Sequence, residues 1–377
     1  MLNTDSPSRN IGLDFVRSMA IVLVLIAHDS LFFHGAGRDV SAILHGSGFF
    51  GVELFFVLSG FLIGDILIRN VVFHNTLEVL LDFWKRRWLR TLPAYYLVWC
   101  VLYIISSHNP ADFKSLVMLQ SFYPSAISIF GVSWSLASEE WFYLLTPILL
   151  CFLAKIRVFS REKLITIFCI AGIILFPLLR ALAATWLDES WGMIRKYSFI
   201  RFDAFLYGIL ISLMQHYYSN IYRWIARYKY VFILFSGVGL IFCALQFFNV
   251  ENLETFFNKT LLFSLADLCF MPILVICESA VVFKKWDHTW KKNLVYFISI
   301  TRYSVYLIHW DIMEYFRGFK FSNGKIIHAV ILLLICLAVT YFLSYILYRF
   351  WEKPFMNLRN RKILIPKLTK STVNVTD

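Results

Sequence analysis

The chain has 377 residues, of which 59% are hydrophobic and only 16% are charged, and its mean hydropathy is +0.67. A soluble domain carries about 25% charged residues, so this composition is that of a membrane protein. The net charge is +12, but the aromatic residues lie in apolar runs rather than on basic patches, which argues against nucleic-acid binding. The seven cysteines also fall in apolar stretches without a C-x-x-C pair. We expect them to be buried apolar side chains rather than disulfides or metal ligands.

Apolar segments of transmembrane length recur along the chain. A helix needs about 20 mostly apolar residues to cross the hydrocarbon core of a bilayer. The sequence therefore predicts an all-α fold, a polytopic membrane helix bundle with about ten transmembrane helices. The predicted spans, in chain order, are roughly 13–33, 49–68, 91–107, 134–153, 164–186, 200–216, 230–248, 260–279, 294–315 and 326–348. Short polar loops separate them, and no internal repeat is visible.

The basic residues are concentrated in alternate loops. If the N-terminus lies in the cytoplasm, the inner segments hold 24 lysines and arginines and the outer loops hold 8. Cytoplasmic loops of membrane proteins carry the excess of positive charge, so both termini are predicted to be cytoplasmic. The net charge is therefore an orientation signal.

The first predicted span contains ionisable residues at membrane depth. Asp14 lies near its start, Arg17 lies inside it and His28 lies at its far end. Arg17 and His28 are eleven residues apart, which is nearly three helical turns, so both point to one face about 16 Å apart along the axis. Ionisable residues inside the membrane are costly and usually functional. The alternative is that His28 is a hydrogen-bonded core residue.

The second span begins G-V-E-L-F-F-V-L-S-G-F-L-I-G and contains Glu53, Ser59 and Gly60. One interpretation is that Ser59 and Gly60 form a small-residue contact with another helix, with Glu53 in water at the outer surface. The other interpretation is that Glu53 belongs to a functional site.

A basic cluster follows in F-W-K-R-R-W-L-R-T-L-P, residues 83–93. Arg86 and Arg90 are four residues apart and are expected on one helical face. Such a cluster either anchors a helix among lipid headgroups or binds a phosphate, because arginine matches phosphate oxygens with two parallel hydrogen bonds. Arg87 lies between them, and Pro93 suits an early position of the next helix.

Two further spans begin with charged residues. The fourth begins S-W-S-L-A-S-E-E-W-F-Y-L-L-T-P, with Glu139 and Glu140 adjacent. Neighbouring helical residues point about 100° apart, so we expect only one of them to face the bundle interior. The alternative is that both reach the outer surface. The sixth begins R-F-D-A-F-L-Y-G, where Arg201 and Asp203 are expected to pair at the outer interface.

The ninth span carries a polar stripe. Ser299, Arg302, Tyr306 and His309 recur at helical spacing on one face of an otherwise apolar segment. Such a face is expected to contact protein or water rather than lipid. With the predicted orientation, the histidines and glutamates of the polar set fall in the outer half of the membrane, and the basic cluster of residues 86–90 falls at the inner surface. This arrangement suits the transfer of a group across a membrane.

Four of these stretches carry a resemblance to a known family. Arg17 and His28 form an R-x10-H pair, and the second-span sequence G-V-E-L-F-F-V-L-S-G-F-L-I places Glu53 where the family commonly has aspartate. The basic cluster reads R-R-x-x-R-x-x-P, and the fourth span reads W-S-L-x-x-E-E-x-F-Y-L-L, with Glu139 four residues after Ser135. Together these motifs resemble the membrane-bound acyltransferase-3 family, whose members O-acylate carbohydrates and other acceptors.

The resemblance covers almost the whole chain and implies a particular organisation. It implies an acyltransferase-3-type transmembrane domain over residues 1–355 and a cytoplasmic C-terminal tail over 356–377. Some members of the family carry an extra hydrolase-like domain after the bundle, and we expect this chain to have the bundle only. It implies an enzyme of the plasma (inner) membrane that transfers an acyl group, most often acetyl, from cytosolic acyl-CoA. The expected acceptor is a hydroxyl of a cell-surface polysaccharide or its lipid-linked precursor. We expect no metal and no nucleic-acid partner.

Site roles follow from the resemblance and from acid–base chemistry. A hydroxyl needs a positioned base to act as a nucleophile, and histidine titrates in the required range. We expect His28 to be this base, or alternatively to carry the acyl group. We expect Glu139 to fix its tautomer, as carboxylates do in acyl-transfer triads, and Arg17 to hold the pantetheine arm or a phosphate. The remaining candidates are Arg86, Arg87 and Arg90 for the coenzyme A phosphates, and Glu53, Ser135, Arg302, Tyr306 and His309 as ligands or proton partners.

Two other functional classes fit parts of the pattern. Buried Arg, Glu and His would also suit a proton-coupled transporter, although carriers commonly show internal repeats with broken helices at matched positions. A metal-dependent membrane enzyme is the weakest alternative, because no H-E-x-x-H or similar ligand set occurs. The sequence thus favours a membrane O-acyltransferase, with a transporter as the alternative.

Overall fold

The computed structural model describes residues 9–29, 38–71, 76–105, 112–122, 129–155, 159–248, 250–279, 283, 286, 289–317 and 326–358. Every regular element within these ranges is a helix, which confirms the predicted all-α class. Seven of the described helices are long and apolar enough to cross a membrane. These are α1 (Ile11–Asp29), α2 (Arg38–Ile66), α4 (Leu77–Ile105), α6 (Ser133–Leu153), α7 (Arg161–Trp186), α11 (Lys229–Leu245) and α16 (Ile326–Leu347).

The other described helices are shorter or more polar. They are α5 (Phe113–Leu116), α8 (Trp191–Ile194), η4 (Phe199–Arg201), α9 (Asp203–His216), α10 (Ser219–Arg227), η5 (Gln246–Phe248), α12 (Val250–Leu253), α13 (Phe256–Thr260), α14 (Leu262–Glu278), α15 (Trp290–Arg317) and α17 (Lys353–Leu358). Two wide π-helical turns, η2 (Leu67–Val71) and η7 (Tyr348–Glu352), follow α2 and α16. Most of the predicted tail, residues 359–377, lies outside the described residues.

Three of the ten predicted spans correspond to helices that do not read as spans by length and composition. α9 has 14 residues and α14 has 17, which is short of the about 20 residues that a hydrocarbon core requires. α15 has 28 residues, but lysines, arginines and acidic residues interrupt its apolar character. The count of ten therefore stays a prediction, whereas an integral membrane helix bundle is what the structure supports.

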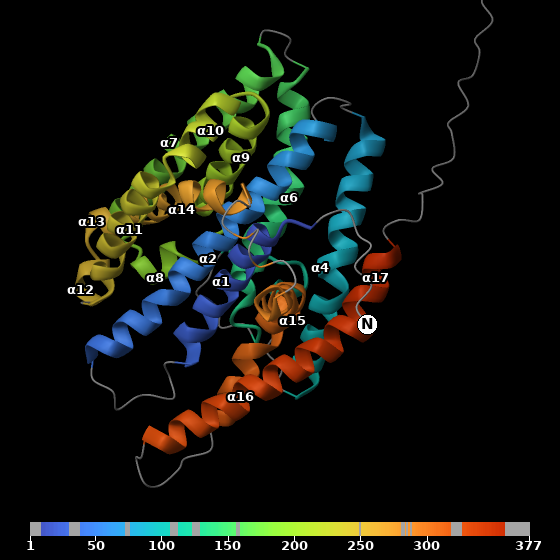
Figure 1. Ribbon diagram of the computed structural model, residues 1–377, viewed down its shortest axis with the longest axis vertical. Coiled ribbons are helices and arrows are strands. Elements are labelled where there is room, and N and C mark those ends of the chain that lie inside the picture. The colour runs from blue at the N-terminus through green and yellow to red at the C-terminus, as the bar shows by residue number, and fades with distance from the viewer. Residues whose placement is uncertain are drawn as a thin grey trace, which may run out of the picture.

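Two groups of helices flank a central pair (Figure 1). α1 and α2 pack against each other in the middle of the bundle. α7, α9, α11 and α14 lie on one side, where α9 packs against α2 and α11 packs against α14. α4, α16 and α17 lie on the other side, and α15 connects this side to the centre by packing against both α1 and α16.

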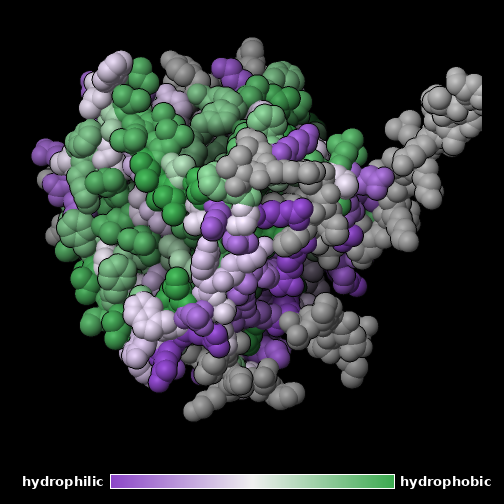
Figure 2. All heavy atoms as spheres, turned by 90° about the horizontal axis from the view of Figure 1, so that it is seen from above, coloured by the Kyte–Doolittle hydropathy of each residue, from purple (hydrophilic) through white to green (hydrophobic). Residues whose placement is uncertain are grey.

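The outer surface of the bundle is apolar where lipid is expected. Figure 2 shows hydrophobic residues over a broad part of one face and hydrophilic residues gathered on another part. Large apolar side chains such as Ile174 of α7, Leu234 of α11 and Phe342 of α16 are exposed. A contiguous apolar surface of this extent is unfavourable in water, which agrees with insertion in a bilayer. Of the cysteines, six are buried and only Cys100 is exposed, and none forms a disulfide.

Helices α2 and α9 approach so closely that their backbones touch. A Cβ atom added at Gly60 would lie 1.9 Å from the carbonyl oxygen of Phe205, and one added at Gly208 would lie 2.1 Å from that of Val57. Small residues permit such contacts between membrane helices. The predicted small-residue contact is therefore confirmed at Gly60.

We expect Gly60→Ala to lower the thermal stability of the purified protein in detergent, because the new methyl group collides with backbone that cannot move aside. Overpacking of this kind costs about 1–3 kcal/mol. Gly237→Ala in α11 is the matched control, because a Cβ there meets nothing within 4 Å. A melting temperature for Gly60→Ala equal to that of the control would contradict the backbone contact.

The basic cluster of residues 86–90 lies inside one long helix. α4 runs from Leu77 to Ile105, with Pro93 in its interior, so the predicted start of this span at residue 91 was too late. Phe83 is buried and Trp84 donates its indole N–H to the carbonyl oxygen of Tyr143 at 3.1 Å. These aromatic contacts lie in the part of α4 that precedes the arginines. The arginines themselves form one wall of the site described next.

Candidate active site

Five helices converge on one pocket. α1, α2, α4, α6 and α15 each contribute side chains to its wall. Those from α2 are aromatic or apolar except for Ser59, and those from the other helices are charged or hydroxylic except for Leu136. Because the contributing residues lie far apart in sequence, the pocket depends on the tertiary packing of the bundle. The polar and charged lining residues are Arg17, Ser59, Arg87, Arg90, Thr91, Ser135, Glu139, Tyr143, Arg302, Tyr303 and Tyr306.

Glu139 is the central hydrogen-bond acceptor of this pocket. Its Oε1 accepts hydrogen bonds from the Ser59 hydroxyl at 2.8 Å, from the Arg87 guanidinium and from the Tyr143 hydroxyl. Arg87 also donates to the Tyr143 oxygen at 2.7 Å, and its guanidinium carbon lies 3.9 Å from the Tyr143 ring centre. Tyr143 follows Glu139 by four residues, so both project from one face of α6. Hydrogen bonds to charged groups are the stronger ones, so this cluster holds α2, α4 and α6 together.

These contacts differ from the expected role of Glu139. The sequence pairs Glu139 with His28 as its tautomer-fixing carboxylate, whereas the structure directs Glu139 to Arg87, Tyr143 and Ser59. The adjacent Glu140 is also buried but does not line the pocket. The expectation that only one of the two glutamates faces the bundle interior was therefore wrong, because Glu140 is buried as well and only Glu139 lines the pocket.

A second pocket, which we call the arginine pocket, adjoins the first. Arg17, Arg90, Arg302 and Tyr303 line both pockets. The second pocket adds Arg9 and Glu352, so positive side chains outnumber negative ones in its wall. A concave site with an excess of arginine attracts anions, and guanidinium groups match phosphate oxygens especially well.

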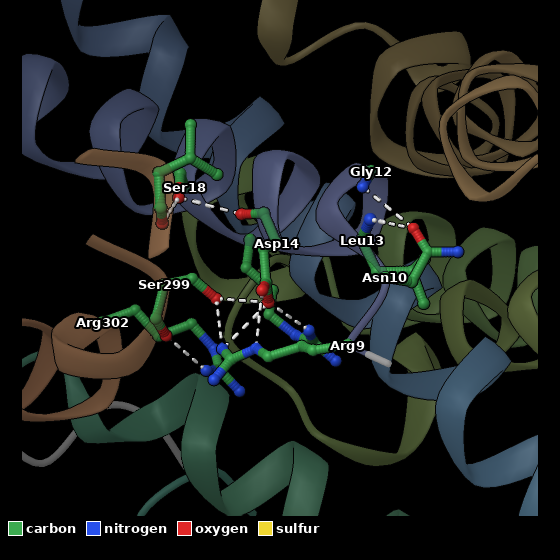
Figure 3. Close-up of polar contacts among 10 residues, drawn as sticks. Arg9, Asn10, Gly12, Leu13, Asp14, Ser18, Ser299 and Arg302 are labelled. Carbon is green, nitrogen blue, oxygen red and sulfur yellow. Dashed lines mark hydrogen bonds and ion pairs between the residues drawn. The ribbon is translucent and has the colours of Figure 1, made fainter. Parts of the chain in front are cut away.

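Asp14 organises the arginines at the start of α1 (Figure 3). Its carboxylate contacts Arg9 at 2.6 Å and the Ser299 hydroxyl at 2.8 Å. It also contacts Arg17 at 2.7 Å. Arg9 also donates to the Ser299 oxygen at 3.0 Å, and Arg302 donates to the Ser299 carbonyl at 2.7 Å. One carboxylate thus positions two arginines of the second pocket against α15.

The three arginines of the α4 cluster have different surroundings. Arg86 is about half exposed and pairs with Asp82 one turn earlier at 2.6 Å. Arg87 is held by Glu139, and Arg90 lines both pockets. Among the described residues, none forms a hydrogen bond or ion pair with Arg90, so its donors are available to a ligand. Arg86 and Arg90 are one turn apart on the same face of α4, as expected, but only Arg90 lines the pockets.

The polar stripe of α15 faces protein rather than lipid, as expected. Tyr306 and Ser135 of α6 form a hydrogen bond through their hydroxyl oxygens, and Tyr306 also donates to the carbonyl oxygen of Val132 at 3.1 Å. Ser299 and Arg302 contact the arginine pocket, as described above. The stripe therefore contacts α1 and α6 rather than lipid.

His28 and His309 form a direct contact at the far end of the α1–α15 interface. His309 Nε2 lies 3.0 Å from His28 Nδ1, and His309 Nδ1 lies 2.9 Å from the carbonyl oxygen of Tyr306. Trp310 packs edge-on against the His28 ring with 5.0 Å between ring centres. Neither histidine is among the lining residues of the two pockets. Within the described part of the chain, no group of three His, Cys, Asp or Glu that could hold a metal ion occurs.

A separate buried network contains Glu53. Glu53 accepts a hydrogen bond from Arg201, and both are almost fully buried. Asp203 accepts two hydrogen bonds from Arg180, at 2.7 and 2.8 Å, with both side chains fully buried. The predicted pairing of Arg201 with Asp203 at the outer interface was therefore wrong. The interpretation of Glu53 as a group in water at the outer surface was also wrong.

The sequence missed several residues that build the pockets. Arg9 and Glu352 lie near the two ends of the described chain, and only the fold brings them to the second pocket. Tyr143 lies in the W-S-L-A-S-E-E-W-F-Y-L-L stretch, and its i+4 spacing from Glu139 is a signal that the two side chains share a helical face. Ser59 had been interpreted only as a small residue, but its hydroxyl bonds Glu139.

The comparison with known families gives the class of the protein. Residues 10–349 match the family model described as "Acyltransferase domain", Acyl_transf_3. The match covers nearly the whole chain, so the chain belongs to this acyltransferase family. The resemblance inferred from the four motifs is confirmed.

Individual relatives carry the name O-acetyltransferase. The chain is 26% identical over 376 residues to "O-acetyltransferase OatA" of Staphylococcus aureus strain NCTC 8325 / PS 47, covering 93% of this chain and 57% of that protein. It is 26% identical over 393 residues to a "Putative O-acetyltransferase" of S. aureus strain MRSA252, covering 97% of this chain and 61% of that protein. The chain thus spans about three fifths of the length of these relatives. No solved structure matches it.

Proposed function

We propose that this protein is an integral membrane O-acyltransferase that moves an acetyl group from cytosolic acetyl-CoA to a hydroxyl of a cell-surface polysaccharide or its lipid-linked precursor. The observation that carries the proposal is the set of three arginines shared by two adjoining pockets. Arg17 on α1, Arg90 on α4 and Arg302 on α15 converge there, within a chain of the acyltransferase family. The names of the relatives support O-acetyl transfer as the reaction.

The proposed topology is ten spans with both termini on the cytoplasmic side of the plasma membrane. The bias of basic residues toward alternate loops supports this orientation. In it, α9 and α14 cross within the protein interior, where neighbouring helices rather than lipid surround them, and α15 turns its polar stripe toward α1. The arginine pocket then opens toward the cytoplasm and His28 lies toward the outside.

In the proposed donor complex, the arginine pocket holds the coenzyme A phosphates. Within the part of the chain that the structure describes, Arg90 has no hydrogen-bond partner, and Arg302 donates from one of its nitrogens to the Ser299 carbonyl. Arg87 is engaged by Glu139 and shapes the wall, while exposed Arg86 stands apart. Arg17 and His28 are about 16 Å apart along α1, a span that the extended pantetheine arm can bridge. The thioester would then lie near His28.

The proposed chemistry is a proton-coupled acyl transfer. His28 accepts the proton of the acceptor hydroxyl as its oxygen attacks the thioester carbonyl carbon. The tetrahedral intermediate collapses with cleavage of the carbon–sulfur bond, and His28 returns the proton to the departing coenzyme A thiolate. A route through an acetylated His28 would use the same residue. In either route Glu139 acts on the pocket through Arg87 and Tyr143 rather than on His28.

The direct test is transfer of radiolabel from acetyl-CoA to glycan by the purified protein in liposomes. Cell-envelope glycan is supplied on the face opposite the donor, and vesicles without protein are the control. Labelled glycan above the control supports the proposal. If the label stays in acetyl-CoA with every glycan fraction tested, the proposal is contradicted. Proton-coupled uptake of a solute into the liposomes would instead support the transporter.

We expect Arg90→Gln to raise the KM for acetyl-CoA while leaving kcat at saturating donor little changed. Hydrogen bonds to charged groups contribute about 1.5–3 kcal/mol, or roughly 10- to 100-fold in affinity. Arg86→Gln is the matched control from the same helix and is expected to change KM by no more than about twofold, because exposed ion pairs contribute little. Equal effects of the two variants would remove Arg90 from the donor site.

A further inference from the structure

The contact between His28 and His309 has a defined polarity. The His309 ring is fully buried, and its Nδ1 lies 2.9 Å from the carbonyl oxygen of Tyr306 and 3.1 Å from that of Val305. Carbonyl oxygens only accept hydrogen bonds. The hydrogen of the neutral His309 ring is therefore on Nδ1, and both carbonyls belong to the preceding turn of α15, so the helix itself fixes this tautomer.

The tautomer of His309 determines that of His28. With its hydrogen on Nδ1, His309 has a lone pair on Nε2, which lies 3.0 Å from Nδ1 of His28. The hydrogen in the bond between the two rings must then be on Nδ1 of His28. In a neutral ring this leaves the lone pair of His28 on Nε2. We infer that His309 is a positioning residue that holds His28 in the Nδ1–H tautomer, so that His28 Nε2 is the nitrogen that takes the acceptor proton.

Two features make this arrangement restrictive. Trp310 packs edge-on against the His28 ring at 5.0 Å with an interplanar angle of 76°. The His28 ring also contacts the His309 ring, with 5.0 Å between the two ring centres. The tautomer and the plane of the His28 ring are therefore set together, as a carboxylate sets them in acyl-transfer triads. Here a neutral ring replaces the carboxylate expected at Glu139.

The inference rests on the proposed function for its catalytic meaning, but the tautomer itself can be measured without activity. The experiment is ¹⁵N NMR of the histidine-labelled full-length protein in lipid nanodiscs. The His28 signals are assigned by their disappearance in His28→Ala. A protonated Nδ1 and an unprotonated Nε2 on His28, both perturbed in His309→Leu, support the inference. A His28 with hydrogen on Nε2 in the wild type overturns it, whatever the protein catalyses.

Two variants of His309 separate positioning from packing. His309→Leu fills the space but cannot accept a hydrogen bond, whereas His309→Gln keeps an acceptor oxygen near the Nε2 position. We expect His309→Leu to lower kcat by roughly 10²-fold, at the low end of what a general base contributes, with the KM for acetyl-CoA unchanged. We expect His309→Gln to recover most of that loss.

The outcomes are distinguishable. Equal loss in the leucine and glutamine variants, with a folded protein and unchanged His28 ¹⁵N signals, would show that His309 only packs and would overturn the inference. If His309→Leu does not fold, the wild-type tautomer and the glutamine variant still decide it. Absence of acetyl transfer in the wild type would refute the proposed function. The His28 tautomer would still be decided by the ¹⁵N measurement, which does not depend on activity.

Discussion

Replacing His28 by alanine is expected to reduce acetyl transfer by at least roughly 10³-fold, within the range attributed to a positioned general base. The variant loses the group that we propose takes the acceptor proton and returns it to the coenzyme A thiolate. Because His28 stands about 16 Å along the helix from Arg17, outside the arginine pocket, donor binding should survive. The measurement is initial rate of radiolabel transfer against acetyl-CoA concentration, with kcat falling and KM retained.

A histidine outside the site provides the control for this variant. His216, at the end of α9, contacts Asp65 at 2.7 Å and lines neither pocket. His216→Ala is expected to keep activity within about threefold, since loss of a partly exposed pair costs about 1 kcal/mol or less. Transfer by His28→Ala at the rate of this control would refute the role assigned to His28.

The second large effect is expected at the buried pair of Arg180 and Asp203. Arg180 donates from Nε to the Thr260 carbonyl, from Nη1 to the Ile200 carbonyl, and from both Nη atoms to Asp203. Asp203→Ala leaves the guanidinium buried without its counter-charge. Breaking a buried pair in this way costs about 3–5 kcal/mol. We expect a large fall in melting temperature in detergent and reduced yield of folded protein.

The structure offers two comparisons for this prediction. The double variant Arg180→Met/Asp203→Leu removes both charges and is expected to be more stable than Asp203→Ala, because replacing a whole buried pair by apolar groups is often neutral. Arg69→Ala breaks an exposed pair with Asp65 at 2.7 Å and is expected to cost at most about 1 kcal/mol. A melting temperature of Asp203→Ala equal to that of Arg69→Ala would show that the pair is not stabilising.

Periodicity within one helix was sufficient to predict which residues share a face. The spacing of Arg17 and His28 placed both on one side of α1, and each meets α15: Arg17 shares both pockets with Arg302, and His28 contacts His309. The stripe on α15 likewise faces protein. These relations depend only on 3.6 residues per turn, so they can be derived before the fold is known.

Partners from different helices could not be derived in this way. Glu139 pairs with Arg87 across two helices, and His309 takes the position expected for Glu139, because helix rotation and depth are set by packing. The error at Arg201 and Asp203 has a local reason. Side chains two residues apart on a helix do not face each other. Arg201 and Asp203 therefore point in different directions, and Arg201 pairs with Glu53 whereas Asp203 pairs with Arg180.

The backbone contact between α2 and α9 has a consequence for how the enzyme moves. Where no side chain separates two helices, neither can slide or rotate without a steric collision. We therefore expect α2 and α9 to move together as one rigid unit. Among the described residues, α4 joins the bundle through side chains such as Arg87 and Trp84, together with Trp351, which donates to the Pro93 carbonyl at 2.8 Å. Opening that admits and releases substrates is therefore expected at α4, with hydrogen exchange faster there than in α2 and α9.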